Sequence, residues 1–123
     1  MSTIQRFEDL EIWQMAREIS KKVFRITQRE VFLQDRGLGQ QIRDSSGSVM
    51  DNIAEGFERD GNKEFKHFLS IAKGSAGETR SQLYRALDQQ YITKDEFNEL
   101  YVKLVELSRK IKSFMNYLGA SSI

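Results

Sequence analysis

The chain contains 123 residues, of which 39% are hydrophobic and 30% charged, and it has no cysteine. This length fits a single domain, expected over residues 1–123, and the missing thiols exclude a disulfide framework and a thiolate metal site. Nineteen basic residues balance eighteen acidic ones, so net charge gives no general attraction to nucleic acid, and any such attraction must come from local patterning.

The N-terminal residues lack the apolar region of an export signal. No apolar run approaches the roughly 20 residues that cross a bilayer. We therefore expect a cytoplasmic protein with no membrane partner, and the absence of cysteine suits that reducing compartment.

Proline is absent and no segment alternates as a half-buried strand does, so the pattern predicts helices throughout. Four are expected, at about residues 9–28, 36–58, 62–89 and 93–118. Each is on the order of 30 Å long, and short connections make neighbours antiparallel. The predicted fold is an all-α, antiparallel up-down-up-down four-helix bundle.

The ends of these helices carry chemical signals. The first is expected to begin at the N-cap Asp9, the second to stop by Gly61, and the third to begin at the N-cap Asn62. The fourth is expected to begin with the capping box Thr93–Glu96 and to end at Gly119. The expected core positions, in chain order, are Ile12, Ala16, Ile19, Val23, Ile26, Leu38, Ile42, Val49, Ile53, Phe57, Phe65, Leu69, Ala72, Ala76, Thr79, Leu83, Ala86, Phe97, Leu100, Leu104, Leu107, Ile111 and Leu118.

Basic residues gather on two helices. On the first they lie opposite the apolar stripe, and on the third they recur every seven residues with Tyr84 on the same line. Such a row beside an aromatic ring is typical of contact with a phosphate backbone and a stacked base, although charge on the outside of a bundle is also ordinary solvated surface. The candidate nucleic-acid residues are Arg17, Lys21, Lys22, Arg25, Arg29, Lys66, Lys73 and Arg80.

The same charges suggest self-association as a further interpretation. Acidic residues form a strip on the second helix, and a basic strip of another copy could meet it across an interface. Trp13 and Phe24 widen the apolar sector of the first helix, either for such an interface or to cover the protomer's own core. The candidate interface residues are Trp13, Phe24, Asp44, Asp51 and Glu55.

Small and polar residues in the second and third helices lower the intrinsic stability of a helix interior. Close approach of the two helices at these residues would offset that cost. We interpret Ser45, Asn52 and Glu78 as structural polar residues. Glu55 with Glu78 could form an acid–base pair, but no nucleophile accompanies them. The single histidine, His67, rules out the paired Glu-x-x-His motifs of a di-iron bundle within one chain. We predict no catalytic residue, no metal and no cofactor.

Six short segments of the chain carry a family resemblance. They are Phe7–Trp13, Gly37–Leu38, Gln41–Arg43, Asn52–Gly56 (Asn-Ile-Ala-Glu-Gly), and Lys63–Phe65 with Phe68–Leu69. Together they resemble the bacterial four-helix-bundle family of large-subunit (23S) ribosomal RNA intervening-sequence proteins. One departure is Met50, where such proteins often carry proline.

The resemblance implies a helical bundle similar to proteins that assemble as cyclic pentamers. It also implies similarity to the accessory proteins of diversity-generating retroelements, which bind a reverse transcriptase and nucleic acid. It implies no enzyme. The expected function is a non-catalytic oligomeric accessory protein that binds RNA or DNA or joins a ribonucleoprotein. The alternative is a scaffold that binds a protein partner without touching nucleic acid.

Overall fold

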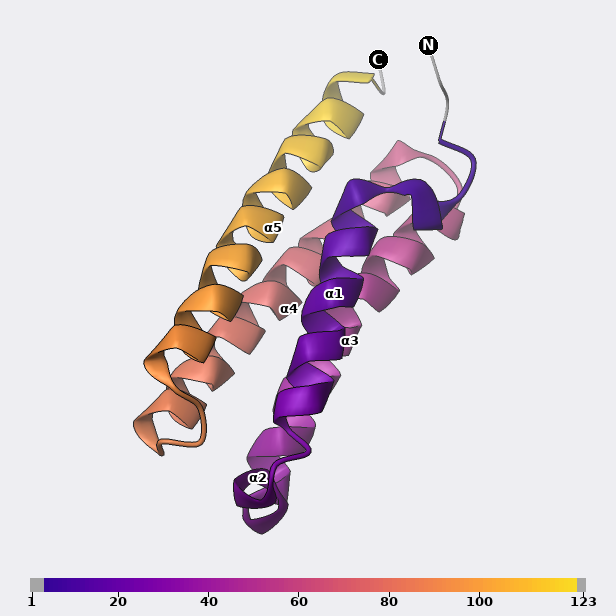
Figure 1. Cartoon of the computed structure of the whole chain (residues 1–123). Coiled ribbons are helices and arrows are strands. Elements are labelled where there is room, and N and C mark those ends of the chain that lie inside the picture. The colour runs from indigo at the N-terminus through magenta and orange to yellow at the C-terminus, as the bar shows by residue number, and fades with distance from the viewer. Residues whose placement is uncertain (1–3, 122–123) are drawn as a thin grey trace.

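Four long helices dominate the computed structural model, which describes residues 4–121. The elements are η1 (Phe7–Asp9), α1 (Glu11–Ile26), α2 (Glu30–Gln34), α3 (Arg36–Glu58), α4 (Asn62–Asp88) and α5 (Lys94–Ser121). The described part of the chain contains no strand, and the long helices run alternately up and down (Figure 1). The predicted all-α antiparallel bundle is confirmed. None of these helices has the length and apolar character that crossing a membrane requires.

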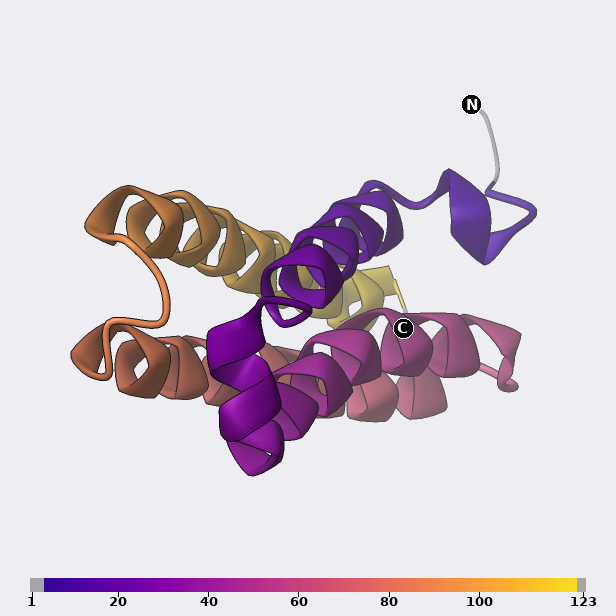
Figure 2. The same ribbon diagram turned by 60° about the horizontal axis from the view of Figure 1, so that its bottom comes forward.

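The helices form two layers, α1 with α5 over α3 with α4 (Figure 2). Each of the four long helices packs against two of the other three, in the cyclic order α1, α3, α4, α5, and the diagonal pairs do not pack together. The edge between α1 and α5 has the least extensive contact of the four. As a result, the α1–α3 edge and the α4–α5 edge lie on opposite sides of the bundle.

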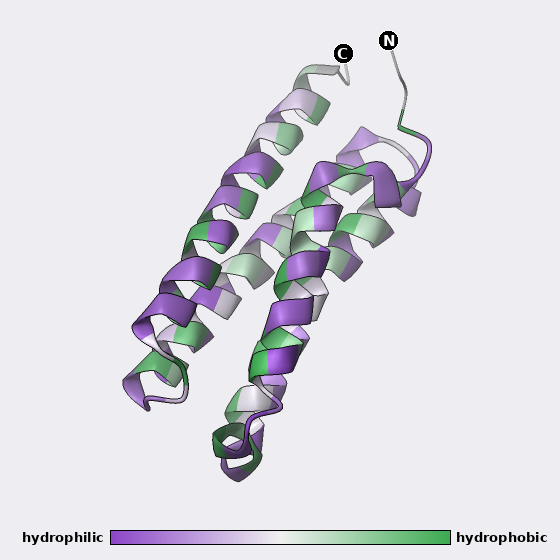
Figure 3. Ribbon diagram, in the orientation of Figure 1, coloured by the Kyte–Doolittle hydropathy of each residue, from purple (hydrophilic) through white to green (hydrophobic). Residues whose placement is uncertain are grey.

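The core consists of the periodic apolar positions. Ile53, Leu69 and Leu104 are completely buried, and hydrophobic residues recur along the side of α5 that faces the other helices (Figure 3). Burying each large aliphatic side chain contributes roughly 1.5–3 kcal/mol relative to exposure. Ile26 and Phe57, at the helix ends, are only partly buried but pack against this core.

Several helix ends differ from the sequence-based expectation. Asp9 is not an N-cap, because the chain enters the core one residue later, at the buried Leu10, and Asp9 remains in η1. Gly61, with φ of 85°, caps α4 instead of Asn62. Asn62 is the first residue of α4, and its side-chain amide donates to the carbonyl of Leu118 at 3.3 Å. That bond pairs a carbonyl of the last turn of α5, which lacks an intrahelical donor, and α5 continues through Gly119 to Ser121.

The short helix α2 was not expected, because five residues are too few to show a period. Phe32 of α2 is buried, and its ring meets that of Tyr91 edge to face at 5.2 Å. The Tyr91 hydroxyl donates to Asp35 at 3.1 Å, and Asp35 in turn accepts from the amide of Leu38 as the N-cap of α3. These contacts link the α1–α3 connection to the α4–α5 connection at one end of the bundle.

Glycines of the bundle divide into close-packed and open positions. A Cβ at Gly56 would lie 2.8 Å from the Cβ of Phe68 and 3.3 Å from the Phe65 carbonyl oxygen, so α3 and α4 touch there. Gly47 and Gly74 would meet nothing within 4 Å. Close helix approach therefore explains Gly56 but not Gly47 or Gly74.

Exchanging glycine for alanine should have opposite effects at these positions. Gly56→Ala forces α3 and α4 apart and should lower the free energy of unfolding by about 1–3 kcal/mol. Gly74→Ala only removes the entropic cost of helical glycine and should raise it by up to about 1 kcal/mol. Urea denaturation at one protein concentration measures both, and a Gly56→Ala variant as stable as wild type would contradict the contact.

Candidate nucleic-acid interface

The basic residues of α1 are divided between two edges of the bundle. A shallow hollow of about 400 Å³ on the α1–α3 edge is surrounded by Arg17, Lys21 and Arg25. Its lining also includes Phe24 of α1 and Met50 of α3. Phe24 is 56% exposed, so this surface joins cations to an apolar ring. We call Arg17, Lys21, Phe24 and Arg25 the α1 basic surface.

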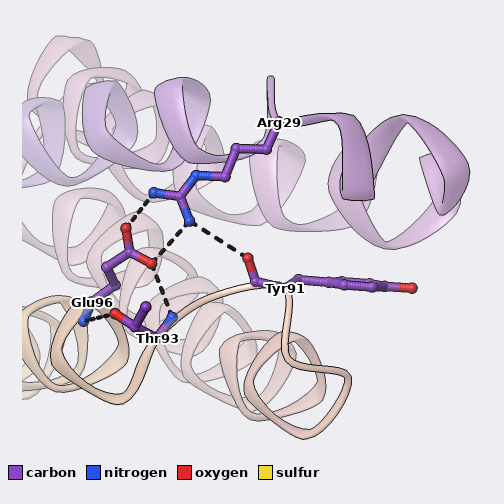
Figure 4. A network of polar contacts seen from close by, with 4 residues as sticks. All are labelled: Arg29, Tyr91, Thr93 and Glu96. Carbon is purple, nitrogen blue, oxygen red and sulfur yellow. Dashed lines mark hydrogen bonds and ion pairs between the residues drawn. The ribbon is translucent and has the colours of Figure 1, made fainter.

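Lys22 and Arg29 face the other edge, toward α5, where acidic side chains pair with them. Lys22 binds Glu99, and hydrogen bonding to Glu99 raises the pKa of Lys22. Arg29 forms a bidentate ion pair with Glu96, in which Nη1 lies 2.9 Å from Oε1 and Nη2 contacts Oε2 (Figure 4). The same guanidinium donates to the backbone carbonyl oxygen of Tyr91 at 3.5 Å. These two cations are thus already neutralised within the protomer.

Glu96 also completes the predicted capping box, which is confirmed. Its carboxylate accepts from the amide of Thr93 at 2.9 Å, and the Thr93 hydroxyl accepts from the amide of Glu96 at 3.1 Å (Figure 4). Hydrogen bonds from the Arg29 guanidinium and from the Thr93 amide lower the pKa of Glu96 from 4.5 to about 2. The charged carboxylate therefore stabilises the folded state above pH 4.5, and this contribution is lost as the pH falls toward 2.

Removing this charge should change the acid stability of the bundle. Glu96→Gln should lower the free energy of unfolding by about 1 kcal/mol at pH 7, a value reduced for partial solvent exposure. It should also flatten the pH dependence between 4.5 and 2. Denaturant titrations over this range measure both effects. Glu106→Gln, at an exposed acid of α5 without an ion pair in the described structure, is the control. An unchanged pH profile in Glu96→Gln would contradict the assignment.

The basic residues of α4 lie along its edge with α5. The Arg80 guanidinium donates to the Ser108 hydroxyl at 3.3 Å and lies 6.0 Å from the ring centroid of Tyr101. Lys66 is at the far end of the row, where its Nζ would be 3.1 Å from a Cβ at Gly119. The seven-residue spacing places the exposed Lys73 between them, without an ion pair in the described structure.

Aromatic side chains continue this row. Tyr84 is 47% exposed, and its ring lies 4.7 Å from Phe97 and 5.9 Å from Tyr101, centroid to centroid. Hydrogen bonding with Tyr101 raises the pKa of Tyr84. Lys112, exposed one turn after Ser108, adds another cation.

Apart from Asp88 at its end, this row has no acidic neighbour on α4. On a helix that turns 100° per residue, Glu78 lies about 160° from Arg80 around α4. Glu99 points toward α1, and Asp88 follows Tyr84 by one turn at the end of the row. The basic and aromatic residues define what we call the α4–α5 face, which consists of Lys66, Lys73, Arg80, Tyr84, Tyr101 and Lys112.

The predicted nucleic-acid residues therefore do not form one site within a protomer. The α1 basic surface and the α4–α5 face lie on opposite sides of the bundle, and Lys22 with Arg29 belongs to neither. Sequence reasoning missed Tyr101 and Lys112, because helical periodicity does not tell which side of α5 lies beside the basic row of α4.

The expected interface residues occupy different environments. Trp13 is partly buried against the core, with Phe7 edge to face at 5.2 Å and Arg17 over its ring at 5.6 Å, so it covers the protomer's own core. Phe24 leaves its ring in solvent. Asp44 accepts from Gln40 at 2.7 Å and Glu55 pairs with Arg59 at 2.7 Å, whereas Asp51 is exposed without a partner in the described structure.

Two of the three expected structural polar residues lie in a hydrogen-bonded seam between α3 and α4. The buried Ser45 hydroxyl donates to the side-chain amide oxygen of Gln82 at 2.6 Å and accepts from the Thr79 hydroxyl at 2.8 Å. The side-chain amide of Asn52 donates to the backbone carbonyl of Ser48 at 2.8 Å and to the Ser48 hydroxyl at 2.9 Å. The Ser48 hydroxyl lies 3.0 Å from that of Ser75 on α4.

Glu78 does not belong to this seam. It is exposed at a shallow hollow of about 320 Å³ and has no hydrogen bond or ion pair in the described structure. His67 is also exposed and contacts the edge of the Phe68 ring. Within residues 4–121, no cluster of His, Cys, Asp or Glu side chains is arranged to hold a metal ion.

Fold and surface together define the class, a four-helix bundle with a surface of cations and aromatic rings on each of two opposite edges. Residues 8–113 match the family described as 23S rRNA-intervening sequence protein, so the chain belongs to that family.

A solved structure resembles the fold over most of both chains. It is a protein of unknown function from the S23 ribosomal protein family of Bacteroides thetaiotaomicron VPI-5482. The TM-score is 0.77 at 20% sequence identity, and the match covers 85% of this chain and 97% of the other. No curated protein matches the chain.

Proposed function

We propose that the protein is a non-catalytic, cytoplasmic homo-oligomer that binds nucleic acid or joins a ribonucleoprotein as an accessory component. The observation that carries the proposal is the row of cations beside aromatic rings on the α4–α5 face of a nearly neutral chain, with Asp88 only at the end of the row. Family membership and the S23 ribosomal protein family of the structural neighbour agree with this assignment.

Self-association would strengthen a modest patch. Each protomer offers only a few unpaired cations per edge, which bind phosphates weakly alone. Several copies in one ring, a pentamer by resemblance, would present these cations together and raise the affinity through multivalency. Phe24 is one of the exposed large apolar side chains that contact with another copy would cover, and the exposed Asp51 could meet a basic residue across such an interface.

The second candidate is a protein-binding scaffold. The α1 basic surface favours it, because Phe24 and Met50 add apolar contact area beside the cations. By resemblance, one partner of this kind would be a reverse transcriptase.

The double variant Lys21→Glu/Arg25→Glu separates the two candidates. Loss of a protein partner with intact RNA retention supports the scaffold. Loss of RNA retention with an intact protein partner supports nucleic-acid binding by this surface.

Nucleic-acid binding should depend strongly on salt. For the intact protein, the logarithm of the RNA or DNA association constant should fall linearly with the logarithm of salt concentration. Lys66→Gln/Lys73→Gln should reduce this slope by about 1.4 on a single strand if each protomer loses two phosphate contacts. Fluorescence anisotropy over a salt series measures the slope. Lys22→Gln, whose charge is already paired with Glu99, should leave it unchanged. Absent or salt-insensitive binding by the wild-type protein would refute the proposal.

A further inference from the structure

Tyr84 presents an aromatic surface that the bundle holds in one orientation. Its ring is 47% exposed, while Phe97 supports it from the core, with centroids 4.7 Å apart. Phe97 itself stacks on Tyr101 at 5.4 Å with 27° between the planes, and Tyr101 contacts Tyr84 edge to face. Since these neighbours already limit the motion of the Tyr84 ring, a flat ligand on its outer side would lose little binding energy to side-chain ordering.

The nearest cation is also held in place. Arg80 precedes Tyr84 by one helical turn, and Ser108 and the Tyr101 ring fix its guanidinium. Lys73 and Lys66 continue the row away from the ring. At 1.5 Å per residue, Lys66 to Tyr84 covers about 27 Å along α4, enough for several nucleotides of an extended strand.

This combination distinguishes between forms of nucleic acid. A duplex could satisfy the cations, but its bases are stacked on each other and hide their faces from the ring. An unpaired base has a free face for stacking, and its phosphates can follow the basic row. Stacking on one aromatic ring tolerates any base, so the chemistry is shared by RNA and DNA strands.

We propose that the α4–α5 face binds single-stranded nucleic acid, with an unpaired base stacked on Tyr84 and neighbouring phosphates contacted by Arg80, Lys73 and Lys66. This inference rests on the proposed nucleic-acid function and specifies its ligand and its location. The α1 basic surface then serves another purpose, such as contact with protein.

The test compares labelled probes of equal length by fluorescence anisotropy with the intact protein. The probes are an oligouridine RNA, an oligothymidine DNA, a duplex, and an abasic DNA strand that keeps the phosphates but lacks bases. Wild type should bind the RNA and DNA strands more tightly than the abasic strand, and the ratio of the first two shows which sugar is preferred.

Tyr84→Leu should weaken binding of the base-containing single strands roughly five- to hundredfold, with little change for the abasic strand or the duplex. Tyr84→Phe, which keeps the ring, should bind as wild type does. The matched control is Tyr117→Leu, at a tyrosine that is 61% exposed and lies about 160° from Tyr101 around α5. Arg80→Gln should lower the salt slope by about 0.7 on a single strand.

The possible outcomes separate this inference from the broader function. If Tyr84→Leu folds, keeps its oligomer size and binds single strands like wild type, the inference is wrong while nucleic-acid binding stands. Equal affinity for the abasic strand, or displacement of oligouridine by oligoglutamate at similar concentration, would also overturn it, the latter in favour of an acidic protein partner. If the intact wild-type protein binds none of the probes, both proposals fail.

Discussion

Ion pairing across the α1–α5 edge determines which charges of this bundle remain for a ligand. Glu11 pairs with Lys110, Lys22 with Glu99 and Arg29 with Glu96, at the edge where the helices have least contact. Exposed pairs contribute at most about 1 kcal/mol each, so their main effect here is on charge distribution. They neutralise one side of α1 and leave Arg17 and Arg25 unpaired on the other. Two acids of α5, Glu96 and Glu99, are occupied in the same way and point toward this edge rather than toward α4.

Polar side chains between α3 and α4 are tolerated because they satisfy one another. Ser45, Thr79 and Gln82 are buried where other layers of the core are aliphatic, yet no buried side-chain polar atom in residues 4–121 lacks a hydrogen-bond partner. An unpaired hydroxyl in this place would cost about 1–3 kcal/mol. A hydrogen-bonded seam requires one alignment of the two helices, whereas purely aliphatic layers tolerate sliding. The direct contact at Gly56 also fixes the alignment of α3 and α4, since only one alignment brings that glycine against Phe68.

Periodicity was sufficient for the helices and the core, because a helix of 16 residues or more repeats its apolar pattern several times. Periodicity failed for α2, which is too short to repeat a pattern. It also misplaced the N-caps of α1 and α4, which are Leu10 and Gly61. The candidate site was only partly predictable. The sequence showed the row through Lys73 and Arg80 with Tyr84, but the relative rotation of α4 and α5 brought Tyr101 beside it. Likewise, pairing of Lys22 and Arg29 with α5 depends on residues about 70 positions away, which no local pattern reveals.

The α1–α5 edge also joins the most distant parts of the chain, up to 99 residues apart at the Lys110–Glu11 pair. By contrast, α3 and α4 are joined by a turn of three residues and have the most extensive contact in the bundle. Closing a long segment of chain costs more entropy than closing a short one. At the α1–α5 edge this larger cost is offset by less extensive contact than α3 and α4 make with each other. We therefore expect the α3–α4 hairpin to form first in folding and the α1–α5 edge to close last. Native-state hydrogen exchange would display that order as weaker amide protection in α1 than in α4, and equal protection would argue against it.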